Sequence, residues 1–239
     1  MASTRERKQF RSITTKELCT KFGAQFFLNE RKEIMTIYPK ISNTVSKLGV
    51  GIGTVNLPAL LTCREDAPCR KGCYACKGNF IYANVKTSLR NNLQAFIDDS
   101  NRFFNVLHHQ LEMVPYRFFR WHSSGEIVNE KYLEGMCWLA RKHKDTQFLC
   151  FTKKYELVNE YLNNHRKPKN LVLVFSNWGD WICNNPHNLP TAWVEFGKET
   201  DSLIPSNANV CGGNCGTCVN TSEHCWRMQK GESVKFHRH

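Results

Sequence analysis

From residue 116 onward, apolar and polar residues follow the repeating pattern of strands that alternate with helices. Short apolar runs between polar loops predict strands at 116–121, 147–152, 170–176 and 191–197. Between these runs, apolar residues at helical spacing predict helices at 129–143 and 153–165. Several strand-then-helix units in succession indicate an α/β fold, with either a parallel sheet or a partial β/α barrel.

The remaining segments are expected to surround or extend this core. A strand is predicted at 34–38, and a glycine-rich extended segment at 46–63 leads to the first cysteines. One or two helices are predicted within 84–114, and a short strand at 233–237. The predicted organisation is an N-terminal segment packed on the core, a β/α core with the first cysteine loop, and a cysteine-rich C-terminal extension that binds a metal or cluster, at 1–45, 46–205 and 206–239 respectively.

Composition favours a folded protein with a sizeable core, because 41% of the 239 residues are hydrophobic and 12% are aromatic. The 33 Lys and Arg residues exceed the 21 Asp and Glu residues, which gives a formal net charge of +12. The opening MASTRERKQF lacks the apolar region of a secretory signal, and no apolar run reaches the roughly 20 residues that span a bilayer. We therefore expect a cytoplasmic protein with no membrane partner, in which surplus cysteines indicate metal or redox chemistry.

The twelve cysteines are unevenly distributed along the chain. Four of them stand singly and are interpreted first as structural thiols, namely Cys19, Cys137, Cys150 and Cys183. The other eight fall into two short segments. We name these the first cysteine group, which comprises Cys63, Cys69, Cys73 and Cys76, and the second cysteine group, which comprises Cys211, Cys215, Cys218 and Cys225.

In the first cysteine group, Cys69, Cys73 and Cys76 have the spacing C-x3-C-x2-C. A loop with this spacing can place three thiolates around one face of an iron–sulfur cluster, for which thiolates are the usual ligands. Basic residues in the same loop favour the ligating thiolate form. Zinc is the alternative, because it needs a fourth ligand that Cys63 can supply.

The second cysteine group repeats the spacing at Cys211, Cys215 and Cys218 and adds Cys225 after six intervening residues. Glycines between the first three cysteines allow the backbone to fold tightly around a metal. Four thiolates close a coordination sphere, which indicates a structural zinc or a fully ligated cluster. The spacing alone leaves the choice between these two open.

Polar side chains follow the predicted strands at the end where parallel α/β folds bind ligands. The loops after three successive strands carry His122, Ser123, Gly125 and Glu126, then Thr152 and Lys153, then Ser176, Asn177 and Asp180. We expect an active site there, with Gly125, Glu126, Ser176 and Asn177 as its cofactor-binding residues. The simpler interpretation is that the small residues make turns and that Glu126 is a solvated charge.

Motifs across nearly the whole chain resemble the phage gene-product-88 family. The segments are LPALLTCREDAPCRKGCYACKGNF, FRWHSSGEI, FLCFTK, LVLVFS, CGGNCGTCVNTSEHCW and VKFHRH. That family has no settled function, and it occurs in bacteriophages and in bacterial genomes with phage-derived regions, which implies a bacterial or phage-infected host. Its pattern has cysteines at the positions of both groups except Cys76, where a basic residue is usual.

The first cysteine group and the β/α units after it also resemble the radical SAM superfamily. This resemblance implies that Cys69, Cys73 and Cys76 hold a [4Fe–4S] cluster, that S-adenosylmethionine (SAM) binds its open iron, and that Gly125 and Glu126 contact the methionyl amino group. An electron donor would then be needed to generate a 5′-deoxyadenosyl radical. The second cysteine group resembles the auxiliary clusters of some members. The chain departs from the superfamily pattern in two ways. The aromatic residue that usually precedes the last cysteine is displaced to Tyr74, and the strands are few for a six-unit core. Cys63, Cys69 and Cys73 are the alternative ligands of the cluster.

Two other functions agree with the same residues. The charge of +12 and the interleaved basic and aromatic residues of YRFFRWH, with the basic TRERKQFR and KFHRH, favour a nucleic-acid partner, with the metal centres as structural elements. A two-cluster electron-transfer protein would instead ligate both centres fully. The sequence contains no nucleophile elbow, P-loop or dinucleotide-binding motif, which argues against hydrolase and nucleotide-phosphate chemistry of those kinds.

Overall fold

The computed structural model describes residues 36–43 and 48–237, and the described residues from 37 onward form one compact unit. Most of the predicted N-terminal segment, including residues 34 and 35 of its predicted strand, lies outside the described residues. The strand prediction is wrong for residues 36–38, which have no strand conformation. The backbone just beyond them bonds to helix side chains instead, since Lys40 N donates to Asn92 Oδ1 at 2.8 Å and Gln110 Nε2 donates to the Pro39 carbonyl at 2.7 Å.

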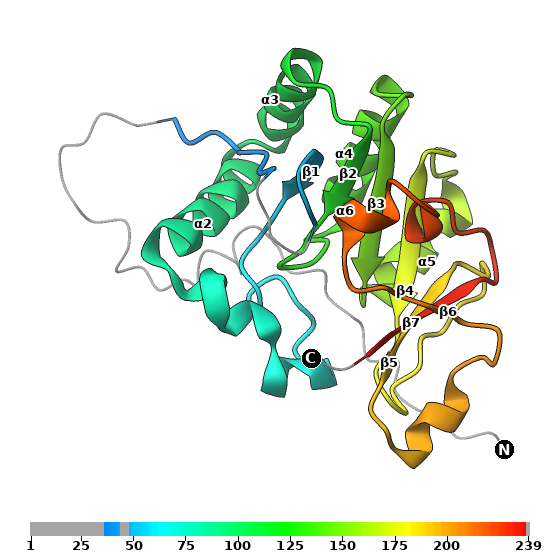
Figure 1. The fold of residues 1–239 in the computed structure, drawn as a ribbon. Helices are drawn as coiled ribbons and strands as arrows, with labels where there is room; N and C mark the ends of the chain where they lie inside the picture. Colours follow the sequence, from blue (N-terminus) through cyan, green and yellow to red (C-terminus); the bar gives the residue numbers. More distant parts are fainter. Residues whose placement is uncertain (1–35, 44–47, 238–239) are drawn as a thin grey trace, which may run out of the picture. The chain divides into compact units, whose positions relative to one another are not determined.

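Seven parallel strands form one sheet in the order β1-β2-β3-β4-β5-β7-β6 (Figure 1). The strands are β1 Ile52–Val55, β2 Phe118–Trp121, β3 Gln147–Thr152, β4 Leu171–Ser176, β5 Thr191–Glu195, β6 Asn209–Val210 and β7 Ser233–His237. The predicted α/β class and parallel sheet are therefore confirmed, whereas closure into a barrel is not confirmed, because the sheet has edges at β1 and β6. Since β6 and β7 belong to this sheet, the cysteine-rich C-terminal segment is part of the same unit.

Five α-helices accompany the strands in the described chain: α2 Ala83–Asp98, α3 Ser100–Met113, α4 Glu130–Lys142, α5 Tyr155–Asn164 and the short α6 Cys215–Cys218. Side-chain caps begin two of the long helices, because Asp99 accepts from Arg102 N and Asn129 accepts from Tyr132 N. The 84–114 region thus contains two helices, which meet at Asp99. No helix in the described chain has the length and apolar character needed to cross a membrane.

The two faces of the sheet are covered by different parts of the chain. On β2, Phe119 and Trp121 are buried on the helix side, where Trp121 packs against Tyr132 of α4 at 6.0 Å between ring centroids. Phe118 alternates to the opposite face and packs against Trp226 at 5.1 Å. Figure 1 shows the C-terminal segment with α6 lying over the strands. We call the face that carries Phe118 the inner face of the sheet.

The inner face is built from one apolar residue or more from most strands and from the C-terminal segment that covers it. The buried cluster comprises Leu48, Ile52, Phe118, Leu149, Val172, Val174, Ala192, Val219, Cys225, Trp226, Met228 and Val234. Cys211, Cys215, Phe151 and Phe236 pack against its border. The second cysteine group is therefore seated on the sheet by hydrophobic burial rather than attached through a linker.

Candidate functional site

The loop after β2 is bound tightly to the end of β1. Asn56 Oδ1 accepts hydrogen bonds from Ser123 N and Ser123 Oγ, both at 2.7 Å, and from Ser124 N at 3.2 Å. Leu57 and Ser124 add two more bonds, from Leu57 N to the Ser124 carbonyl and from Ser124 Oγ to the Leu57 carbonyl, both at 2.9 Å. Sequence reasoning missed Asn56, although its place directly after a strand is the signal that could have found it.

Gly125 is required by this close approach. Its φ of +86° lies in the left-handed region, and an added Cβ would meet Leu57 Cβ and the Leu57 carbonyl oxygen at 2.7 Å. The glycine therefore lets the loop fold against the end of β1 and sets the direction of the next residue, Glu126. In this structure Gly125 positions the loop through its backbone.

Glu126 is a buried, hydrogen-bonded carboxylate and not the solvated charge of the simpler interpretation. It accepts from Thr152 Oγ1 at 2.7 Å and from Lys153 N at 3.0 Å. Burial raises the pKa of Glu126, and the positive charge of Lys153 opposes that shift. The carboxylate also acts electrostatically on Cys63, so it lies beside the first cysteine group.

The predicted residues after β4 lie at the same edge of the sheet, where the carboxyl ends of the parallel strands meet. We call this edge the rim. Lys153 Nζ donates to Ser176 Oγ at 2.8 Å, which links Ser176 to the backbone that holds Glu126. Asn177 is buried, and its Oδ1 accepts from Cys183 N at 2.8 Å. The amide nitrogen Nδ2 of Asn177 is buried with no hydrogen-bond partner among the described residues. Of the four predicted cofactor-binding residues, Glu126 and Ser176 are thus connected through Lys153, and Gly125 supports them.

The first cysteine group lies in the loop between β1 and α2, which contains three short 3-10 turns at Pro68–Gly72, Tyr74–Cys76 and Gly78–Ile81. Cys63, Cys69 and Cys73 are half-buried, whereas Cys76 is exposed. The loop contacts the segment after β2 at two points, because the Tyr74 hydroxyl donates to the Ser123 carbonyl and Glu126 N donates to Thr62 Oγ1 at 3.0 Å. The cysteine loop and Glu126 therefore meet at the carboxyl edge of β1 and β2.

The thiols of the first group act on one another. The pKa of Cys63 is raised to about 12, mainly by burial and in addition by the charges of Glu126, Cys73 and Cys69. The pKa of Cys73 is also raised, first by burial and then by its neighbours Cys76 and Cys69. A bound cation or cluster would reverse these shifts, because a coordinating thiol loses its proton to the metal. The structure thus gathers all four thiols without selecting Cys63 or Cys76 as the third ligand.

The second cysteine group surrounds α6 and the buried Trp226. The pKa of Cys225 is raised to about 12, mainly by burial and in addition by Cys211, Cys218 and Cys215, so the four thiols lie near one another. Two donors point at sulfur, since Gly213 N lies 3.4 Å from Cys211 Sγ and Arg120 Nη1 lies 3.7 Å from Cys215 Sγ. Hydrogen bonds and positive charge at sulfur are features of thiolate metal sites.

Neither cysteine group is spaced for a single ion. Tetrahedral zinc with Zn–S bonds of about 2.3 Å holds its sulfurs roughly 3.8 Å apart. Among the described residues, the ligand atoms that lie within 4.8 Å of one another in a group of three belong to Glu130, Glu134 and His165, not to cysteines. Among the described residues, no three thiols of either group are thus already placed as they would be around a single zinc ion.

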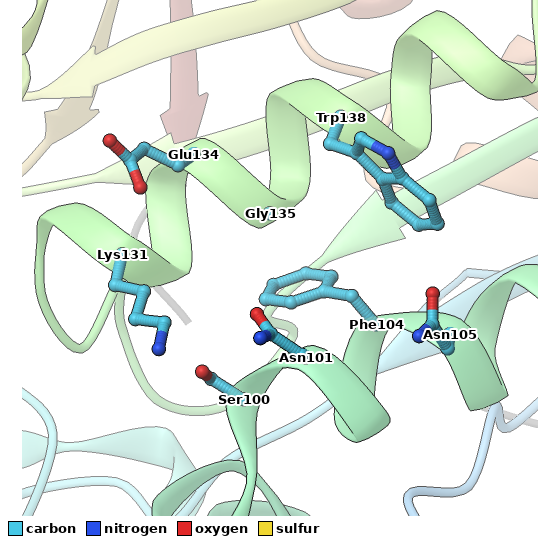
Figure 2. A pocket seen from close by; sticks show the side chains of 8 residues that line it. All are labelled: Ser100, Asn101, Phe104, Asn105, Lys131, Glu134, Gly135 and Trp138. Atoms are coloured by element: carbon cyan, nitrogen blue, oxygen red, sulfur yellow. The ribbon is translucent and has the colours of Figure 1, made fainter.

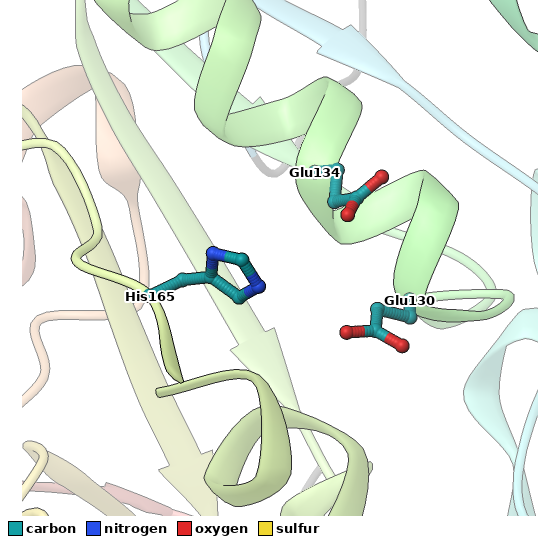
Figure 3. A group of neighbouring side chains, drawn as sticks. All are labelled: Glu130, Glu134 and His165. Carbon is teal, nitrogen blue, oxygen red and sulfur yellow. The ribbon is translucent and has the colours of Figure 1, made fainter. Parts of the chain in front are cut away.

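The cluster of Glu130, Glu134 and His165 is exposed and lies on α4 and just after α5 (Figure 3). The i,i+4 spacing of the two glutamates on one helix was visible in the sequence, but the approach of His165 was not. Tyr161 stacks on the His165 ring at 4.7 Å, which orients the imidazole. This cluster shares no residue with the predicted site.

Two surface hollows flank the described helices. One of about 410 Å³ lies between α3 and α4, where Phe104, Lys131, Glu134 and Trp138 are among its lining residues (Figure 2). None of the predicted site residues lines it. The second, of about 270 Å³, is lined by Cys76 together with Pro58, Ala59, Ala75, Phe80, Ile81, Lys86, Leu89 and Arg90. The second hollow therefore opens beside the first cysteine group.

The single cysteines agree with a structural role where they are described. Cys137 and Cys150 are fully buried, as the apolar stretches around them predict. Cys183 is half-buried, and its backbone N donates a hydrogen bond to Asn177 Oδ1. Cys19 lies outside the described residues.

His122 is buried in the core below the rim, with Nε2 3.1 Å from the Tyr132 hydroxyl, and burial lowers its pKa to about 3. In the unfolded chain a histidine titrates near pH 6.5, so only the unfolded state takes up this proton between pH 6.5 and pH 3. The free energy of unfolding is therefore expected to fall by about 1.4 kcal/mol per pH unit as the pH decreases through this range.

We expect His122→Asn to remove that slope between pH 6.5 and pH 5, measured by urea denaturation. Asparagine tolerates the positive φ of 58° at this position and does not titrate. The control is His109→Asn, because the side chain of His109 is 72% exposed. A pH slope that is equal in His122→Asn and in the parent would contradict the prediction.

A model of the family described as gene product 88 matches residues 28–197. No curated protein and no solved structure matches the chain. The matched residues include the first cysteine group and the rim loops after β2, β3 and β4, and they make up more than half of the chain. The chain belongs to the gene product 88 family.

Proposed function

We propose that this protein is a radical-SAM-like iron–sulfur enzyme, with a [4Fe–4S] cluster at the first cysteine group and SAM at the adjacent rim. One observation carries the proposal. The loop with three closely spaced cysteines and the loop with the buried Glu126 meet at the carboxyl edge of two neighbouring parallel strands, β1 and β2. Parallel α/β sheets bind their ligands at that edge.

The donor set supports a cluster better than a single ion. Cys69 and Cys73 belong to both candidate ligand sets, and either Cys63 or Cys76 supplies the third thiolate. Three thiolates leave one iron of a four-iron cluster open for a ligand, whereas a structural zinc takes four protein ligands. When bound, the cluster supplies the electron for reductive cleavage of SAM, which an external one-electron donor must provide.

The protein's own residues would bind and orient the cofactor. Glu126 has a carboxylate that Thr152 Oγ1 and Lys153 N hold in one orientation, so it can accept from an ammonium group without rearranging. Two groups would contact other polar atoms of the ligand: Ser176 Oγ, which Lys153 Nζ holds, and Asn177 Nδ2, which has no hydrogen-bond partner among the described residues. Burial of this rim would exclude water from the reacting atoms.

Glu126→Gln is expected to weaken SAM binding roughly 10- to 100-fold, because a charge-assisted hydrogen bond to the amino group becomes a neutral one. Isothermal titration of the reconstituted protein with SAM measures the change. Glu130→Gln is the matched control, since Glu130 is exposed at the start of α4. Unchanged SAM affinity in Glu126→Gln would exclude Glu126 from the binding site.

The decisive experiment begins with anaerobic purification and reconstitution, followed by iron, sulfide and zinc analysis. The reduced protein is then incubated with SAM, and 5′-deoxyadenosine is quantified. We expect brown protein that produces 5′-deoxyadenosine and whose reduced EPR signal changes with SAM. Colourless protein that carries zinc, or brown protein that neither binds nor cleaves SAM, would overturn the proposal.

The second cysteine group supports a second centre in the same unit. Its four thiolates can complete the ligand sphere of a cluster, with zinc as the alternative, and Gly213 N and Arg120 direct donors at two of the sulfurs. Two fully ligated centres without SAM chemistry would make the protein an electron carrier. The SAM-dependent change in the EPR signal separates these two functions.

The positive charge supports a polyanionic substrate or partner for the proposed enzyme, with nucleic acid as the first choice. The net charge of +12 would attract a phosphate backbone, and such binding weakens steeply as salt increases. A fluorescence-anisotropy titration with single-stranded DNA and RNA at low and at higher salt tests it. Binding that is absent at low salt, or unchanged by salt, would remove nucleic acid from the proposal.

A further inference from the structure

Arg120 occupies an unusual position on the inner face of the sheet. It lies on β2 between Phe118 and Trp121, and strand alternation places its side chain on the same face as Phe118. Its guanidinium lies 4.9 Å from the centre of the Phe151 ring. The surroundings are therefore the aromatic border of the apolar cluster, not open solvent.

No carboxylate among the described residues lies within 4.0 Å of Arg120 to compensate its charge. Its Nε is buried and has no hydrogen-bond partner in the described chain. A half-buried guanidinium is costly unless an anion or a hydrogen-bond acceptor lies nearby. The nearest polar contact that the structure provides is a thiol, since Nη1 lies 3.7 Å from Cys215 Sγ.

Arg120 reaches the second cysteine group from the sheet. Cys215, the thiol that Arg120 Nη1 contacts, packs together with Cys211 against the border of the inner-face cluster. Arg120 is thus a cation that faces the second group from β2.

We propose that Arg120 is the half-buried counter-charge of an iron–sulfur cluster held by Cys211, Cys215, Cys218 and Cys225, and that it raises the reduction potential of this cluster. A cluster on four thiolates carries net negative charge, and reduction adds one more electron to it. A fixed cation beside one sulfur stabilises the reduced state more than the oxidised state. Arg120 is accordingly a positioning residue that acts through the Cys215 thiolate.

This inference rests on the second centre of the proposed function and does not need SAM chemistry. The test therefore uses the full chain with Cys69→Ser and Cys73→Ser, which removes the first site and leaves one cluster to observe. The cluster is reduced with dithionite, which gives up one electron per cluster, and its midpoint potential is measured by EPR-monitored titration. Iron content is measured in every variant.

We expect Arg120→Gln to make reduction at least ten-fold less favourable, a shift of 59 mV or more toward negative potential for a one-electron couple. Arg120→Lys keeps the positive charge and is expected to keep most of the parent potential. Arg117→Met is the matched control, because the Arg117 side chain is 69% exposed and its charge is already paired with Glu223. Loss of that screened charge is expected to leave the potential unchanged.

Three results would overturn the proposal. They are an unchanged potential in Arg120→Gln, an equal shift in Arg117→Met, and a second site that binds zinc instead of a cluster. A folding defect would lower iron content in Arg120→Lys as well, which separates it from the loss of charge. Failure of the proposed enzyme would look different, because the parent would then make no 5′-deoxyadenosine while its second cluster still responded to Arg120.

Discussion

Cys73→Ser is expected to remove the cluster at the first cysteine group and reduce 5′-deoxyadenosine formation to the background. Cys73 belongs to both candidate ligand sets, so its loss leaves two thiolates whichever of Cys63 and Cys76 is the third ligand. Two thiolates do not hold a four-iron cluster stably, and the protein should lose about four irons of the eight that two clusters contain. Iron and sulfide analysis, with the SAM cleavage assay, measures both effects.

Cys137→Ala is the matched control for this experiment. Cys137 is a fully buried single thiol on α4, outside both cysteine groups, so the variant should keep its iron and its activity. The variants Cys63→Ser and Cys76→Ser then identify the third ligand, because only one of them should lose iron to the same extent. Full iron content and full activity in Cys73→Ser would refute the assignment of the first site.

Trp226→Ala is expected to lower the free energy of unfolding by about 3–5 kcal/mol, the usual cost of truncating a large buried aromatic side chain. Trp226 is 1% exposed and packs on Phe118 in the centre of the inner-face cluster. Its removal leaves a cavity between the sheet and the segment that carries the second cysteine group. Urea denaturation measures the loss, and iron at the second site should fall with it.

The control is Met228→Leu in the same cluster. Met228 is buried beside Trp226 on the inner face, and a swap of similar volume should cost less than about 1.5 kcal/mol. A small loss in Trp226→Ala, comparable to that of Met228→Leu, would mean that the C-terminal segment is not seated by this residue. Unchanged iron content at the second site in Trp226→Ala would mean that this metal site does not depend on Trp226.

Most of the sheet could be predicted from local patterns. The continuous apolar run that became β4 is buried from Leu171 to Phe175, as a central parallel strand requires. The prediction at 34–38 was wrong in its described part, because a short apolar stretch does not reveal which groups will satisfy its backbone. For the neighbouring residues Pro39 and Lys40, the backbone groups are hydrogen-bonded by side chains of α2 and α3, namely Asn92 and Gln110.

The location of the candidate site could be predicted from the sequence, but the hydrogen bonds between its residues could not. Parallel strands place their carboxyl ends together, so Glu126 and Ser176 could be assigned to one rim from their positions after strands. The bonds from Thr152 and Lys153 to Glu126 could not, because they depend on the register between β2 and β3. Asn56 was missed for the same reason, since its partners Ser123 and Ser124 are more than 60 residues away.

The sequence by itself determined the α/β class and the two cysteine groups, because strand periodicity and cysteine spacing are local properties of the chain. Only the tertiary structure decided that the second cysteine group lies on the inner face, and that Arg120 of β2 faces Cys215. The contact between Arg120 and Cys215 joins residues 95 positions apart. Both arrangements arise because β7 inserts beside β5 and because burial of Trp226 draws the C-terminal segment over the sheet.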